Sequence, residues 1–133
     1  MSWFSEWRGY RAFRRIPRSD RRIVFLSESR QDWHHFAPVI RHLTDVLGEP
    51  VLYVSSDPGD PGLHQARPLI RGFCVGQGLW RISFCQFLDA DVLVTQILDF
   101  GNLDLKRSMH PVHVVYMFHS LISTHMADRA NSF

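Results

Sequence analysis

A chain of 133 residues, of which 45% are hydrophobic and 21% charged, is long enough for one domain with its own core. No apolar run approaches the roughly 20 residues of a transmembrane helix, and the amino terminus lacks the apolar segment of a secretory signal. Cys74 and Cys85 match no zinc or redox spacing, and two thiols make no secreted disulfide framework, which favours a reducing compartment. We therefore expect a cytoplasmic protein.

The net charge of +2 is unevenly distributed along the chain. Residues 1–22 carry seven arginines against two acidic residues, whereas the remainder carries eight basic and eleven acidic residues. The basic character thus belongs to an amino-terminal arm, residues 1–20, and not to the domain that follows over residues 21–133. Binding of nucleic acid by that domain is therefore not expected.

Aromatic residues in the arm recur near helical spacing, and most of its arginines lie towards the other side of that helix. The aromatic positions are Trp3, Phe4, Trp7, Tyr10 and Phe13. Pro17 predicts the end of the helix. Two interpretations are open. Either the helix lies at an anionic bilayer surface through residues 1–18, or it packs on the domain with its arginines in water.

The rest of the chain alternates between strand patterns and helix patterns. Apolar, largely β-branched runs predict strands over residues 22–27, 51–55, 70–75, 92–95 and 112–118. Helical spacing predicts helices over residues 33–47 and 79–88, and Pro38 either kinks the first of them or places its true start nearby. This alternation predicts an α/β fold, a three-layer Rossmann-like parallel sheet. The last strand is apolar on both faces, so we expect it in the centre of the sheet.

Several cofactor motifs are absent from the sequence. The first strand is followed by Ser-Glu-Ser-Arg at 27–30 instead of the GxGxxG turn of dinucleotide-binding folds, and there is no GxxxxGK[ST] P-loop. No HExxH or cysteine–histidine spacing indicates a metal site. We therefore expect no bound cofactor and no metal ion. The Gly-Gln-Gly segment at 76–78 suits close approach to a ligand or a plain strand-to-helix turn, and we favour the turn.

His119 comes directly after the last predicted strand. A parallel strand delivers its final residues to the carboxyl edge of the sheet, where open α/β folds bind ligands. A histidine at that edge can accept and release a proton near neutral pH. The alternative is that its ring only forms a hydrogen bond with a neighbouring loop. Ser120 beside it is not expected to be a hydrolase nucleophile, because the GxSxG elbow is absent.

Four segments carry a recognisable pattern, namely residues 22–43, 52–63, 90–108 and 110–126. The most specific parts are Asp-x-Gly-Asn at 99–102 with Lys-Arg-Ser at 106–108, and His-Ser-x-x-Ser-Thr-His-Met at 119–126. Together these segments resemble the CDP-glycerol glycerophosphotransferases, the teichoic-acid-type polymerases and their relatives. The resemblance covers nearly the whole chain from residue 22 onward.

This resemblance implies the amino-terminal half of a GT-B architecture, in which two Rossmann-like domains face a cleft. The amino-terminal domain handles the acceptor, and the carboxy-terminal domain binds CDP-glycerol. Such enzymes transfer glycerol phosphate from CDP-glycerol to a hydroxyl of a growing polymer at the inner face of the cell membrane. We expect this chain to stop before the donor-binding domain and therefore to be inactive alone.

The resemblance also assigns roles to individual residues. It implies that His119 is the general base, and that Asn102, Ser120 and Glu28 bind the substrate. The partners it implies are a hydroxyl-bearing polymer acceptor and, through the carboxy-terminal domain, CDP-glycerol. An alternative from another class is a non-catalytic Rossmann-like binding or interaction module, docked to a membrane or polymer through its basic arm.

Overall fold

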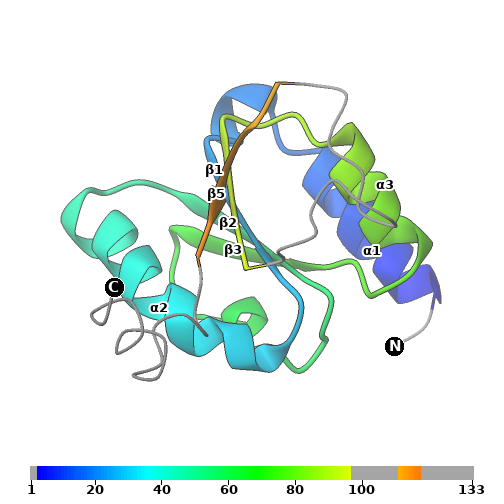
Figure 1. Ribbon diagram of the computed structural model, residues 1–133, viewed down its shortest axis with the longest axis horizontal. Helices are drawn as coiled ribbons and strands as arrows, with labels where there is room; N and C mark the ends of the chain where they lie inside the picture. Colours follow the sequence, from blue (N-terminus) through cyan, green and yellow to red (C-terminus); the bar gives the residue numbers. More distant parts are fainter. Residues whose placement is uncertain (1–2, 97–110, 118–133) are drawn as a thin grey trace, which may run out of the picture.

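The computed structural model describes residues 3–96 and 111–117, and within them it forms a five-stranded sheet (Figure 1). All neighbouring strands run parallel, in the order β3-β2-β1-β4-β5. The strands are β1 (Ile23–Ser27), β2 (Val51–Ser55), β3 (Ile70–Cys74), β4 (Val92–Thr95) and β5 (His113–Tyr116). The prediction of a Rossmann-like α/β fold with a parallel sheet is confirmed.

In the described part of the chain, three α-helices cover the two faces of this sheet. Figure 1 shows α2 on one side and α1 together with α3 on the other. The bounds are α1 (Trp3–Arg14), α2 (Trp33–Arg41) and α3 (Leu79–Phe87). Shorter helical turns join these elements, with 3-10 geometry in η1 (Arg18–Asp20), η2 (Arg30–Asp32) and η4 (Pro61–His64), and π geometry in η3 (His42–Val46). The result is the three-layer arrangement that the alternating pattern predicts.

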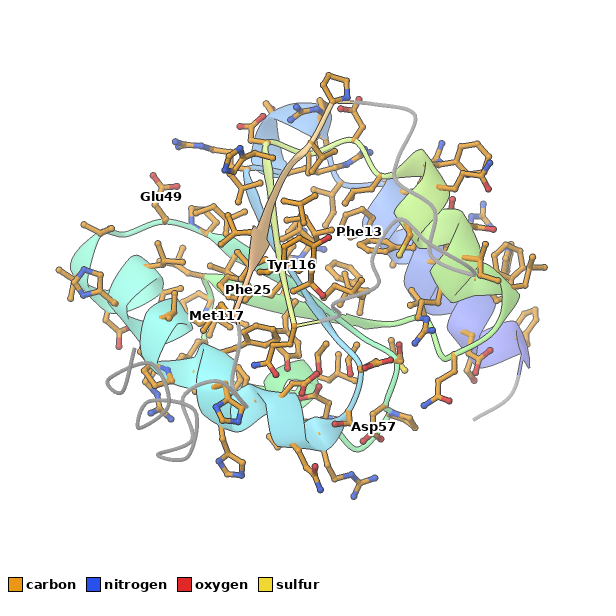
Figure 2. All side chains as sticks on the ribbon, in the orientation of Figure 1. Phe13, Phe25, Glu49, Asp57, Tyr116 and Met117 are labelled. Carbon is orange, nitrogen blue, oxygen red and sulfur yellow. The ribbon has the colours of Figure 1, made fainter. Side chains whose placement is uncertain are left out.

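The strands are buried on both faces because helices cover each side. Successive side chains of a strand point to opposite faces, so Val24 and Leu26 enter the core beneath α1 and α3, while Phe25 enters the core beneath α2. Figure 2 labels one residue from each core, Phe13 and Phe25. Burying one such side chain contributes about 1.5–3 kcal/mol. The apolar strand runs therefore determine the layered fold.

The amino-terminal arm is a helix that packs on the domain. Phe13 is 1% exposed, and its ring centroid lies 5.6 Å from that of Phe73 and 4.9 Å from that of Phe84. Tyr10 stacks on Trp80 of α3 with ring centroids 5.5 Å apart. The helix ends at Arg14, ahead of the proline that was expected to stop it. In the structure, α1 thus packs on the domain with exposed arginines, and the contact of residues 1–18 with a bilayer stays a prediction.

The predicted helix over residues 33–47 is shorter than expected. It begins at Trp33, five residues before Pro38, so Pro38 lies inside the helix. The α-helix ends at Arg41 and continues as one π-type turn, in which the Leu47 amide donates to the carbonyl five residues back. Gly48 then adopts a φ of +67°, the left-handed conformation that ends many helices.

The position of β5 also differs from the prediction. Within residues 3–96 and 111–117 it is the last strand in the sheet order, not a central one. Its side chains alternate in exposure, with Val115 37% exposed, while Val114 and Tyr116 pack against the core beneath α3. An apolar run thus predicted a strand correctly but not its place, because the same composition suits any strand with two partly covered faces.

Candidate functional site

The carboxyl edge of the sheet contains the topological switch point. From β1 the chain passes through α2 to β2 on one side, whereas α3 carries the chain from β3 to β4 on the other side of β1. In chain order β1 is followed by β2 and β4 is followed by β5, and these two strands lie on opposite sides of the β1–β4 pair. Open α/β sheets bind ligands in the crevice at such a switch point. Glu28 follows β1 at this edge, Ser56 follows β2, and Gln96 follows β4.

A buried carboxylate holds the loop after β2 against this edge. Asp60 is completely buried and accepts hydrogen bonds from Ser27 Oγ (2.7 Å), Ser55 Oγ (2.8 Å), Tyr53 Oη (3.0 Å) and the Gly62 amide (2.9 Å). Four donors compensate a buried charge that would otherwise be very costly. Burial raises the pKa of Tyr53 above its usual range, so the phenol keeps the proton that it donates. The cluster is a structural support for the site.

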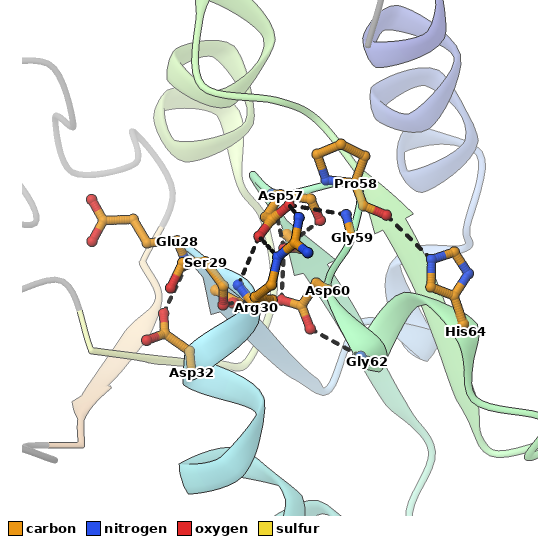
Figure 3. Close-up of polar contacts among 12 residues, drawn as sticks. Glu28, Ser29, Arg30, Asp32, Asp57, Pro58, Gly59, Asp60, Gly62 and His64 are labelled. Atoms are coloured by element: carbon orange, nitrogen blue, oxygen red, sulfur yellow. Dashed lines mark hydrogen bonds and ion pairs between the residues drawn. The ribbon is translucent and has the colours of Figure 1, made fainter.

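An ion pair at the surface joins the loop after β1 to the loop after β2 (Figure 3). Asp57 Oδ2 accepts from the Arg30 backbone amide at 2.9 Å and from Arg30 Nε at 3.0 Å, while Oδ1 accepts from Arg30 Nη2 at 3.2 Å. The Arg30 guanidinium, helped by the Gly59 amide, lowers the pKa of Asp57 to about 2. This pair ties the loop after β1 to the loop after β2.

Glu28 is the predicted substrate-binding residue that the structure describes. Its backbone amide donates to Asp32 Oδ2 at 2.9 Å, which fixes the start of the loop. Its side chain is 54% exposed, and its Oε1 lies 3.9 Å from Nη1 of Arg81. In Figure 3 the Glu28 side chain points away from Asp57 and Asp60. The carboxylate is therefore available at the edge and is not part of the supporting cluster.

Arg81 and Gln96 are polar residues at this edge that the sequence did not single out. Arg81, in the first turn of α3, places its Nη1 3.4 Å from Ser56 Oγ. Gln96 is buried, and neither its amide nitrogen nor its amide oxygen has a hydrogen-bond partner among residues 3–96 and 111–117. The signal that could have indicated Gln96 is a polar side chain that is buried directly after a strand. Burial, however, cannot be read from a single residue in a sequence.

The remaining predicted site residues lie outside the described residues. These are Asn102, His119 and Ser120. The last described residue on this side is Met117, whose amide donates to the Thr95 carbonyl at 2.9 Å and so extends the pairing of β5 with β4. The role of His119 as general base accordingly stays a prediction, as do the roles of Asn102 and Ser120.

A second candidate surface is the outward side of α1. Arg8, Arg11 and Arg14 of the helix and Arg15 directly after it are all exposed, and we call these four arginines the basic face. Phe4 beside them is 50% exposed, with the guanidinium carbon of Arg8 4.6 Å from the centre of its ring. Arg11 lies in the same way 5.2 Å from the ring of Trp7. The helix thus presents positive charge and aromatic surface together.

In the described part of the chain, no group of three or more histidine, cysteine or acidic residues lies close enough to hold a metal ion. Nor does any described helix have the length and apolar character needed to cross a membrane. Comparisons with family models, with curated proteins and with solved structures found no match for the chain.

Proposed function

We propose that this chain is the acceptor-side domain of a CDP-glycerol glycerophosphotransferase-like protein that works at the inner face of the cell membrane. One observation carries the proposal, alongside the sequence resemblance. The strand β5 runs parallel to β4, so it ends at the carboxyl edge that also bears Glu28, and His119 comes three residues later in the sequence. Ligands bind at that edge in folds of this kind.

In the proposed reaction, His119 accepts the proton of an acceptor hydroxyl. The hydroxyl oxygen forms a bond to the phosphorus that carries glycerol in CDP-glycerol, and the bond from that phosphorus to the departing CMP breaks. Glu28, Asn102 and Ser120 would hold the acceptor by hydrogen bonds. A separate donor-binding domain would position CDP-glycerol, because phosphoryl transfer depends on bringing both reactants into line.

The second candidate is a non-catalytic module that docks on an anionic membrane. The observation that favours it is the basic face of α1, where exposed arginines lie beside the half-exposed Phe4. Arginines are attracted to anionic lipid headgroups, and an aromatic ring can enter the interface. The membrane contact itself is compatible with the first candidate, since an enzyme that extends a membrane-linked polymer also benefits from it. The two candidates differ in whether the chain takes part in the transfer reaction.

A reconstituted transfer assay tests the first proposal. The chain is mixed with a donor domain of the same family, CDP-glycerol and a hydroxyl-bearing polymer, and incorporation of labelled glycerol phosphate is measured. We expect incorporation that His119→Ala abolishes and that His113→Ala, a control on the exposed face of β5, leaves unchanged. Absence of turnover with every donor domain, or full activity of His119→Ala, would count against the proposal.

A further inference from the structure

Arg81 is a mostly buried basic side chain at the carboxyl edge of the sheet. Only 13% of its side chain is exposed, although it belongs to the first turn of α3. Its Nη1 lies 3.4 Å from Ser56 Oγ and 3.9 Å from Glu28 Oε1. The guanidinium therefore lies where α3 begins and where β1 and β2 end, next to the switch point.

Within the described ranges, few of the N–H groups of Arg81 have an acceptor. A guanidinium carries five N–H donors. The contact with Ser56 is long, and the separation from Glu28 exceeds hydrogen-bonding distance. The Nε atom is buried and has no acceptor among residues 3–96 and 111–117. Most buried donors in proteins are paired, so this arginine has capacity that the described residues leave unused.

Arg21 provides a comparison within the same molecule. It is also partly buried, yet it donates from Nε to the Ile16 carbonyl at 3.0 Å and from Nη2 to the Arg14 carbonyl at 3.0 Å. Its Nη1 reaches the Asp89 carbonyl at 3.4 Å. Arg21 thus serves the fold by joining backbone segments. Arg81 has no such set of carbonyl acceptors in the described part of the chain.

We propose that Arg81 is the anchor of an oxyanion site that binds a phosphate group. The planar fork of an arginine matches two phosphate oxygens, and the site lies at the ligand-binding edge of the sheet. Ser56 orients the guanidinium. Glu28 is a resident carboxylate that phosphate displaces, because it is half-exposed and makes no hydrogen bond with Arg81. The inference does not rest on the transfer reaction, since it concerns binding alone.

Titration with inorganic phosphate tests the site. Two-dimensional amide NMR spectra of the whole chain are recorded at constant ionic strength, with chloride replacing phosphate. We expect saturable shifts centred on Glu28 and Arg81. Arg81→Lys keeps the charge but loses the fork, so phosphate affinity should fall about tenfold. Arg41→Met, which removes an exposed arginine from α2, should leave the affinity unchanged.

Glu28→Gln should change the phosphate affinity in the opposite direction to Arg81→Lys. It removes the competing negative charge, so phosphate should bind severalfold more tightly than to the wild-type chain. A purely structural role for the pair predicts no gain in affinity. Weaker or unchanged binding in Glu28→Gln, equal affinity of Arg81→Lys and wild type, or no saturable shift in the wild type overturns the proposal. Should Arg81→Lys fail to fold, the comparison of Glu28→Gln with wild type still decides.

Discussion

Replacing Asp60 by alanine should destabilise the protein through the donors that it leaves behind. Ser27, Ser55, Tyr53 and Gly62 all donate to this buried carboxylate, over distances of 2.7–3.0 Å. A buried donor that loses its acceptor costs more than the net value of the bond, because water cannot replace the lost partner. The loss of stability therefore depends on how many of the four donors find another acceptor.

Two of the four donors have an alternative at hand. Ser27 Oγ lies 2.8 Å from the Ser29 carbonyl, and Ser55 Oγ lies 3.3 Å from the Asp57 carbonyl. Both hydroxyls can rotate towards these oxygens. Among the described residues, neither the Tyr53 hydroxyl nor the Gly62 amide donates a hydrogen bond to any acceptor other than Asp60. Two orphaned donors at about 1–3 kcal/mol each give a loss of about 2–6 kcal/mol.

Urea denaturation followed by circular dichroism measures the free energy of unfolding of each variant. Asp60→Asn keeps one carbonyl oxygen as an acceptor, so its free energy of unfolding should fall less than that of Asp60→Ala. Adding Tyr53→Phe to Asp60→Ala removes one orphaned donor, so the double variant should be more stable than Asp60→Ala alone. Asp45→Ala, at an exposed carboxylate, is the control and should have little effect. A loss below about 1 kcal/mol for Asp60→Ala would refute the reasoning.

Three further predictions follow from the packing and the charges. Arg30→Met should raise the pKa of Asp57 from about 2 towards its ordinary value, which a carboxyl-carbon NMR titration measures. Because the folded pKa is depressed, the stability from this pair is complete above the ordinary pKa and is lost as pH falls through about 2. Phe13→Ala should cost about 3–5 kcal/mol by opening a cavity between α1 and the sheet, and an unchanged urea midpoint would contradict the packing of the arm. Replacing the basic face by glutamine should abolish sedimentation with anionic liposomes and leave the circular dichroism spectrum intact, whereas unchanged sedimentation would remove the membrane role.

The elements with clear chemical boundaries could be predicted from the sequence. The strands β2 (Val51–Ser55) and β4 (Val92–Thr95) coincide with their predicted ranges, because each is a short, largely apolar run with two valines, bounded by turn-forming or acidic residues. The end of α2 could not be predicted. Pro38 is tolerated inside the helix, and the chain continues beyond Arg41 as a wider turn that apolar spacing does not distinguish from a regular helix.

The residues of the candidate site were harder to predict from the sequence than the fold. The sequence indicated Glu28, which does lie at the carboxyl edge, but not its neighbour Arg81, since the two meet only through the β3–α3–β4 crossover. Asp60 lies in a sequence segment rich in proline and glycine, residues 57–62, which by composition is a loop. Its burial depends on Ser27 and Ser55, which come from adjacent strands. The residues of such clusters come together only in the folded chain, so no local sequence pattern indicates them.

The pH dependence of transfer by the reconstituted protein tests the central claim most directly. If His119 is the base at the carboxyl edge, the initial rate should rise with pH through the titration of an imidazole, within about pH 5 to 8. His119→Ala should then give a low rate without that rise. The same rising profile in the wild type and in His119→Ala would contradict the account.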